Sequence, residues 1–194
     1  MKQQFGTSKF AVGVLVMIGA LMVTSTASAK NPKEVEMEIV NGKLVITTPA
    51  GANDCPADEP REKGCIKVKK KNKARMYFEL TGDRTCHEEP GNEWELNAVY
   101  LGGYNSATKP GTDDFGFDGV SKANYDKVNS DFNVDRTTGR VDLIKNTKTK
   151  LGINNLNQYE YVVWYKIEAT CQRLDGGEPH IATSDPRVKN GGNQ

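Results

Sequence analysis

Apolar and polar residues alternate along several short segments of the chain, and this period of two is typical of β-strands with one buried face. In residues 158–171, Tyr161 and Tyr165 share one parity, whereas Lys166 and Glu168 share the other. The same alternation occurs at residues 66–68, 74–80, 94–100 and 131–144. We expect no long helix, only a helical turn near residues 121–128.

Residues 35–48 predict a β-hairpin. Asn41-Gly42 is the favoured pair for a two-residue type I′ turn. Such a turn places Met37 opposite Ile46 and Glu38 opposite Val45. The register therefore separates apolar from polar positions, which independently supports the hairpin.

These patterns predict an all-β protein, a single antiparallel immunoglobulin-like sandwich of about seven to eight strands. Alternation, rather than continuous apolar runs, argues against a parallel α/β sheet. Residues 49–64 and 102–130 are rich in Gly, Asp and other turn residues, and we expect long loops there. The core should span about residues 34–188.

The N-terminus has the three parts of a secretion signal. Lys2 and Lys9 are positive, residues 10–23 are apolar, and Ala27-Ser28-Ala29 supplies small residues for cleavage. The apolar run is too short for a hydrocarbon core of about 30 Å. We therefore predict a signal peptide at 1–29, a domain at 30–194, and a periplasmic or secreted bacterial protein without a membrane span after cleavage.

All four cysteines follow this signal, and an even number in an oxidising compartment indicates two disulfides. Three connectivities are open to four cysteines. Cys55 and Cys65 flank one short loop, and Cys86 and Cys171 each end an alternating segment. We therefore predict the pairs Cys55–Cys65 and Cys86–Cys171.

The C-terminal third combines a Tyr/Val-rich strand (159–169), an Asp-Gly-Gly turn and the segment Ser184-Asp185-Pro186-Arg187-Val188. It resembles the end of small bacterial immunoglobulin-like β-sandwich proteins of the DP-EP and PixA/AidA-like groups. The resemblance implies the sandwich fold. Residues 132–143 also resemble the F-x-x-D-x-x-T-G hairpin of cadherin-like repeats, which implies a structural hairpin only.

Charge offers one local feature. The chain has 26 Lys and Arg against 25 Asp and Glu, so its net charge gives no argument for a nucleic acid partner, and we expect none. Residues 67–75 nevertheless contain six cations, a pattern that could hold a polyanion. The six cations are explained equally simply as the solvent-exposed face and tip of a hairpin, and we favour that interpretation.

Residues 131–142 place oxygen-bearing side chains at alternate positions of a calcium-loop frame: Asp131, Asn133, Asp135 and Asp142. Arg136 occupies the position that needs glycine, and the flanks predict strands, so an ordinary hairpin is the favoured interpretation. We expect no cofactor, with calcium as the alternative.

Catalytic signatures are lacking: the chain has two histidines and no Gly-x-Ser-x-Gly motif. We expect a non-enzymatic module that binds a protein partner or a surface polymer such as a polysaccharide, or that serves as an envelope component. The alternatives are a calcium-dependent adhesin-like domain and a glycan hydrolase that uses carboxylates among Glu93, Asp113, Asp114 and Asp118.

Trp164 lies among the alternate positions of its strand that are expected to face solvent. Either the strand is buried on both sides, or Trp164 belongs to an exposed aromatic strip with Tyr77. The candidate binding surface comprises Tyr77, Trp164, Lys69, Lys70 and Lys71.

Overall fold

The computed structural model describes residues 32–49, 52–54, 63–70, 72–111, 114–184 and 186–191. The predicted signal peptide lies outside these residues. The elements in chain order are β1 (Lys33–Val40), β2 (Lys43–Ile46), η1 (Ala52–Asp54), β3 (Ile66–Val68), β4 (Ala74–Leu80), β5 (Glu95–Gly102), α1 (Lys122–Phe132), β6 (Lys145–Thr147), β7 (Lys150–Asn155), β8 (Glu160–Cys171), β9 (His180–Ser184) and β10 (Arg187–Gly191).

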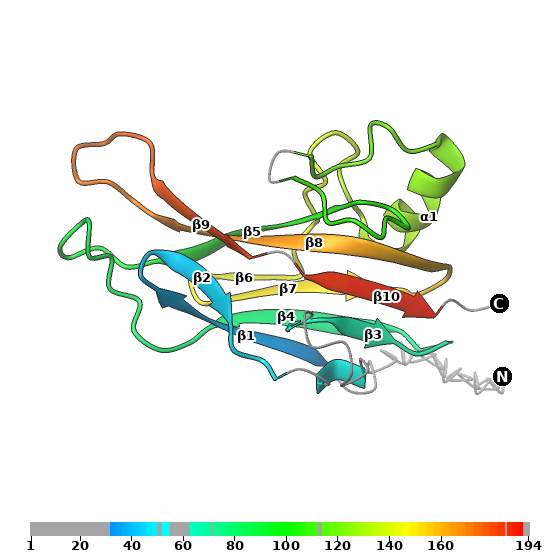
Figure 1. Cartoon of the computed structure of the whole chain (residues 1–194), viewed down its shortest axis with the longest axis horizontal. Helices are drawn as coiled ribbons and strands as arrows, with labels where there is room; N and C mark the ends of the chain where they lie inside the picture. Colours follow the sequence, from blue (N-terminus) through cyan, green and yellow to red (C-terminus); the bar gives the residue numbers. More distant parts are fainter. Residues whose placement is uncertain are drawn as a thin grey trace, which may run out of the picture.

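The strands form two sheets that overlap in the view of Figure 1 and share one hydrophobic core. Sheet A has the order β2-β1-β4-β7-β6, and sheet B has the order β3-β10-β8-β5. In sheet B, β10 pairs with the first half of β8 and β9 with its second half, both antiparallel. Helix α1 lies at one end of the molecule, and the β8–β9 hairpin projects from the other (Figure 1).

The mainly β class is confirmed, but a purely antiparallel arrangement is wrong. β1 pairs with β4, and β3 with β10, in parallel. A parallel neighbour requires a long connection. The chain meets this requirement by crossing to sheet B for β3 before it returns to sheet A as β4. The short strands β6 and β7 and the last strand β10 were not predicted.

The first hairpin has the predicted register: Met37 lies opposite Ile46, and Glu38 opposite Val45. Asn41 and Gly42 have φ values of 51° and 69°, as a type I′ turn requires. The second predicted hairpin is reduced to one bridge, Val134 to Val141, because the residues before it belong to α1. This helix replaces the single helical turn that we expected.

The core lies between the sheets. Alternate residues of β8, from Tyr161 to Cys171, are buried, and the Tyr165 ring meets that of Phe78 of β4 at a centroid distance of 5.2 Å. Helix α1 adds Val128 and Phe132 to this core. The intervening side chains of β8, including Trp164, are only partly buried.

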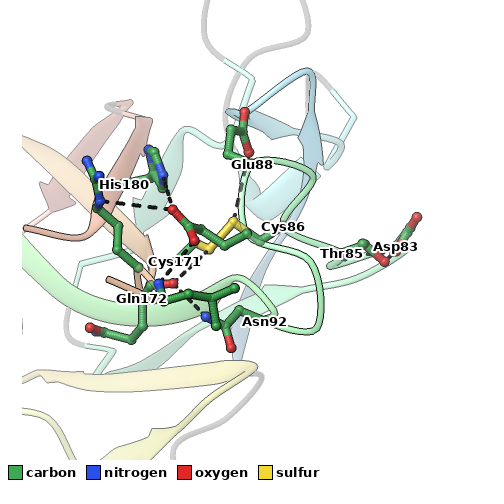
Figure 2. The surroundings of a disulfide bond; sticks show 11 residues. Asp83, Thr85, Cys86, Glu88, Asn92, Cys171, Gln172 and His180 are labelled. Atoms are coloured by element: carbon green, nitrogen blue, oxygen red, sulfur yellow. Dashed lines mark hydrogen bonds and ion pairs between the residues drawn. A yellow bond between two sulfur atoms is a disulfide. The ribbon is translucent and has the colours of Figure 1, made fainter. Parts of the chain in front are cut away.

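The Cys86–Cys171 disulfide is confirmed; its Cα atoms are 6.3 Å apart. It joins the loop after β4 to the end of β8 (Figure 2). The other predicted pair remains a prediction, because Cys55 lies outside the described residues.

Candidate binding groove

A buried polar cluster underlies the end of the molecule where α1 packs. Asp131, the last but one residue of α1, is 1% exposed. Its Oδ2 accepts hydrogen bonds from the Tyr161 hydroxyl at 2.8 Å and from the Asn190 amide at 3.2 Å, and its Oδ1 accepts one from the Gln158 backbone N–H at 2.7 Å. The helix is thereby tied to β8 and β10.

The Asn190 side chain continues the cluster across the core. Its Oδ1 accepts a hydrogen bond from Asn155 Nδ2 at 2.6 Å, so a side-chain pair links β10 of sheet B to β7 of sheet A. Asn155 Oδ1 in turn accepts the Asn157 backbone N–H at 2.8 Å. These groups are satisfied by one another, which removes most of the cost of burying them.

Asn157 fixes the turn between β3 and β4. It is fully buried, and its Nδ2 donates to the backbone carbonyls of Lys69 and Asn72 at 2.8 and 2.9 Å. The Asn72 N–H also donates to the Lys69 carbonyl. The exposed side chains of Lys69 and Lys70 therefore start from a backbone that is held from below.

The loop after β5 forms the opposite wall. The backbone N–H of Asn105 donates to the Val162 carbonyl at 2.8 Å, and its Oδ1 accepts the Val162 N–H at 2.9 Å. The Trp164 indole N–H donates to the Ser106 carbonyl at 3.2 Å. The loop is thus attached to the edge of β8 beyond the end of β5, and to the Trp164 side chain on the outer face.

Between these walls lies a groove of about 440 Å³ on the outer side of sheet B, lined by Lys67, Asn105, Glu160, Tyr161, Val162, Asn190 and Gly191. Lys67 supplies a cation, Glu160 a carboxylate and Asn105 an amide, while Val162 is the apolar element. The Lys70 backbone lies at one end of the groove, next to the lining residue Gly191: a Cβ on Gly191 would stand 2.7 Å from the backbone nitrogen of Lys70. The groove therefore offers both hydrogen-bond donors and hydrogen-bond acceptors.

Burial governs the ionisation of the cluster beneath the groove. Desolvation raises the pKa of Asp131, although the hydrogen bonds from Gln158 and Tyr161 oppose it. Burial, followed by the adjacent Asp131 carboxylate, raises the pKa of Tyr161. Tyr161 therefore remains a neutral hydrogen-bond donor to Asp131.

The predicted aromatic strip does not form one surface. Trp164 lies on the outer side of sheet B, whereas Tyr77 lies on the outer side of sheet A. The Arg187 guanidinium lies 5.1 Å from the Trp164 ring, and Lys150 Nζ lies 5.3 Å from the Tyr77 ring. Because a cation lies over each ring, neither offers a bare platform for stacking. Trp164 serves as a loop anchor.

Of the three lysines in the predicted binding surface, the structure places two near the groove. Lys69 and Lys70 lie beside the groove that Trp164 helps to shape, whereas Lys71 lies outside the described residues.

The four oxygen-bearing residues of the predicted calcium site hydrogen-bond to different partners within the protein. Asp131 faces Tyr161 in the core, Asp135 accepts the Thr138 N–H, and the Asn133 amide donates to Asp142. Three of the four, Asp131, Asn133 and Asp142, do line a small cavity of about 200 Å³ at the C-terminal end of α1. Across the described ranges, no three His, Cys, Asp or Glu side chains cluster as metal ligands would.

The carboxylates proposed for a hydrolase are spread over β5. Glu93 precedes this strand and pairs with Arg84 at 2.6 Å, whereas Gly102 at the far end of β5 bridges Gly116, between Asp114 and Asp118. The strand alone separates them by roughly 20 Å at about 3.3 Å per residue. A carboxylate pair for glycoside hydrolysis stands within about 10 Å. Asp113 lies outside the described residues.

The disulfide lies at the opposite end of the molecule, in a charged setting (Figure 2). Glu89 Oε1 lies 3.1 Å from His180 Nε2, and Glu89 Oε2 accepts the Leu174 N–H at 3.0 Å. Asn92 donates to the Gln172 carbonyl at 2.7 Å. These contacts attach the β8–β9 hairpin to the loop after β4.

Sequence reasoning missed Asn105, Asn157, Glu160 and Asn190. One signal was available: Asn155 and Asn157 interrupt the apolar parity that Leu151 and Ile153 establish, which marks a buried polar site.

No protein-family model matches the sequence, and no curated protein is significantly similar to it. Within the described residues, no helix has the length and apolar character needed to cross a bilayer.

Proposed function

We propose that this protein is an exported, non-catalytic β-sandwich module that binds a polysaccharide of the cell surface in the groove on sheet B. The observation that carries the proposal is the convergence of Lys67, Asn105 and Glu160 on one groove with an apolar floor at Val162. Hydroxyl-rich polymers need both donors and acceptors, and this lining supplies both. The groove walls come from separate elements that are braced from within, so little order is lost on binding.

Export is part of the proposal. The Cys86–Cys171 disulfide favours an oxidising compartment, in agreement with the signal-like N-terminus. N-terminal sequencing of the protein recovered from the periplasm or medium should begin at Lys30. Recovery of an uncleaved chain from the cytosol would contradict this.

We also propose that the two packed sheets are an immunoglobulin-like sandwich in the broad sense, as the resemblance of residues 159–169 and 184–188 suggests. Many cell-surface domains share this architecture without sharing strand topology. An experimental structure in which the sheets do not face each other would remove this part of the proposal.

The groove itself is tested by filling it. Val162→Phe adds bulk to the floor, and Val45→Phe adds the same bulk to the outer face of sheet A, where Val45 is 40% exposed. In affinity electrophoresis against a panel of polysaccharides, Val162→Phe should weaken retention roughly tenfold or more, as expected when a bound group is sterically excluded. Val45→Phe should leave it unchanged.

Two results would count against the proposal. Retention by no polysaccharide would favour a protein partner. Release of reducing ends that disappears on Asp114→Asn or Asp118→Asn would favour a hydrolase.

A further inference from the structure

Two lysines near the groove, Lys67 and Lys70, differ from Lys148 and Lys150 near sheet A in their ion pairing. On the sheet A side, Lys148 pairs with Glu95, and Lys150 pairs with Glu79 at 2.6 Å. Lys67 and Lys70 form no ion pair within the part of the chain that the structure describes. Both are exposed, and they lie on the wall and at the end of the groove.

The turn that carries Lys69 and Lys70 is held by hydrogen bonds from a buried side chain. A loop of exposed lysines needs no buried support for solubility alone. Here the fully buried Asn157 places both amide hydrogens on carbonyls of the turn, and its own backbone is tied through Asn155 to Asn190 under the groove. A buried polar cluster of this kind is costly unless every member is satisfied, and it orders whatever it holds.

From this arrangement we propose that the polymer bound in the groove is a polyanionic polysaccharide, recognised by Lys67 on β3 and by Lys70 on the adjacent turn that Asn157 preorganises. This inference rests on the proposed function. Repeating carboxylate or phosphate groups along a glycan match a row of lysines, and exposed lysine contacts with them weaken as salt rises. Glu160 is the one carboxylate in the lining, and it opposes such a ligand.

The first test compares polymers. The protein purified after export is titrated with polygalacturonate, a phosphomannan, neutral dextran and a single-stranded DNA oligonucleotide, at about 50 and about 500 mM NaCl. An acidic glycan should bind at least roughly tenfold more tightly than dextran at low salt, and most of this preference should vanish at high salt. The stronger of the two acidic glycans identifies the anionic group as carboxylate or phosphate.

The second test uses charge variants with matched controls. Lys67→Gln with Lys70→Gln should weaken binding of the preferred glycan about tenfold, since two screened contacts are lost. Glu160→Gln should strengthen it about two- to fivefold, since a repulsion is removed. The controls are Lys43→Gln with Lys145→Gln, and Glu36→Gln, all exposed on strands of sheet A; they should change little.

The third test addresses the support of the turn. Asn157→Asp keeps the shape of the side chain, removes both donors and points a carboxylate at two carbonyls. It should reduce affinity for the acidic glycan with Lys67 and Lys70 still present. Because this variant could fail to fold, the lysine and Glu160 variants carry the decision if its circular dichroism is lost.

The outcomes separate the two proposals. Equal affinity for dextran and acidic glycans, or weaker binding by Glu160→Gln, would overturn the polyanion inference and leave a polysaccharide-binding groove. DNA bound as tightly as the glycans would also overturn it, in favour of general polyanion binding. Binding of none of the polymers would overturn the proposed function itself.

Discussion

At the scale of single residues, the unusual feature is a set of polar side chains used as core. Asp131, Asn155, Asn157 and Asn190 are each at most 5% exposed, and each has hydrogen-bond partners. Apolar residues of similar size could fill this volume at less desolvation cost. What they could not do is hold backbone carbonyls of a turn and the end of a helix at fixed positions.

Asp131 gives this cluster a pH dependence. Burial raises its pKa above the ordinary 3.8, so the folded protein binds a proton more tightly than the unfolded chain. That stabilisation is complete below 3.8 and is lost as pH rises through the raised pKa. Relative to Asp131→Asn, the wild type should therefore lose stability over this window, by about 1.4 kcal/mol for each unit of pKa elevation.

Urea unfolding between about pH 4 and pH 8 measures this difference. Asp118→Asn, at an exposed position, serves as the control and should run parallel to the wild type. A wild-type curve that rises with pH relative to Asp131→Asn would show that hydrogen bonding outweighs burial at this carboxylate.

The pKa of Glu89 is shifted in the opposite direction to that of Asp131. The Leu174 N–H and His180 lower its pKa, so its contribution is present above the ordinary 4.5 and is lost as pH falls through the lowered value. Glu89→Gln should accelerate hydrogen exchange of the Leu174 amide several-fold near neutral pH, since a charged acceptor becomes neutral. Glu178→Gln on the same hairpin is the control, and equal protection in both variants would refute the role of Glu89.

At the scale of elements, two glycines share the same turn conformation, but only one of them is packed closely against the backbone of another element. Gly139 and Gly176 have φ values of 73° and 74°, so alanine meets the same backbone penalty at both. A Cβ on Gly139 would stand 2.1 Å from the Leu101 carbonyl oxygen, whereas nothing lies within 4 Å of one on Gly176. Gly139 lets residues 134–141 cover the free edge of β5, where the Leu101 N–H donates to the Gly139 carbonyl.

Gly176→Ala should therefore cost about 1 kcal/mol, and Gly139→Ala at least about 2 kcal/mol more, because backbone must move to relieve the contact. Denaturant midpoints of the two variants provide the comparison. Equal losses would mean that the covering segment is free to shift and does not define the edge of sheet B.

The elements also show what the sequence can and cannot predict. The β1–β2 hairpin was predictable to the residue, because the Asn41-Gly42 turn fixes its register locally. The parallel partners of β1 and β10 were not, since partner choice depends on segments far apart in the chain. Helix α1 escaped notice because its three core-facing apolar residues, the partly buried Tyr125 and the buried Val128 and Phe132, have helical spacing among eight mostly polar residues. Likewise, Asn157 has no local signature for the turn that it supports.

At the scale of the whole molecule, the ends are secured by different chemistry. Helix α1 and the β8–β9 hairpin lie at opposite ends (Figure 1). The end near α1 relies on the polar cluster below the groove, and the end with the β8–β9 hairpin relies on the Cys86–Cys171 disulfide. A binding surface at the first end is therefore separated from the covalent link. Loss of the disulfide should lower global stability and leave the shape of the groove intact in the folded fraction.

The variant Cys86→Ala with Cys171→Ala tests this separation. The bond closes a sequence separation of 85 residues, for which loop-closure entropy gives about 4.5 kcal/mol before strain. We expect a loss of about 3–5 kcal/mol in urea unfolding, with affinity for the groove ligand unchanged at a temperature where the variant is folded. The variant is preferable to reduction, because Cys65 is also disulfide-bonded and a reductant would break both links. Weaker ligand binding by a fully folded variant would show that the two ends are coupled, and that the hairpin braced by Glu89 and the disulfide helps to position sheet B for the ligand.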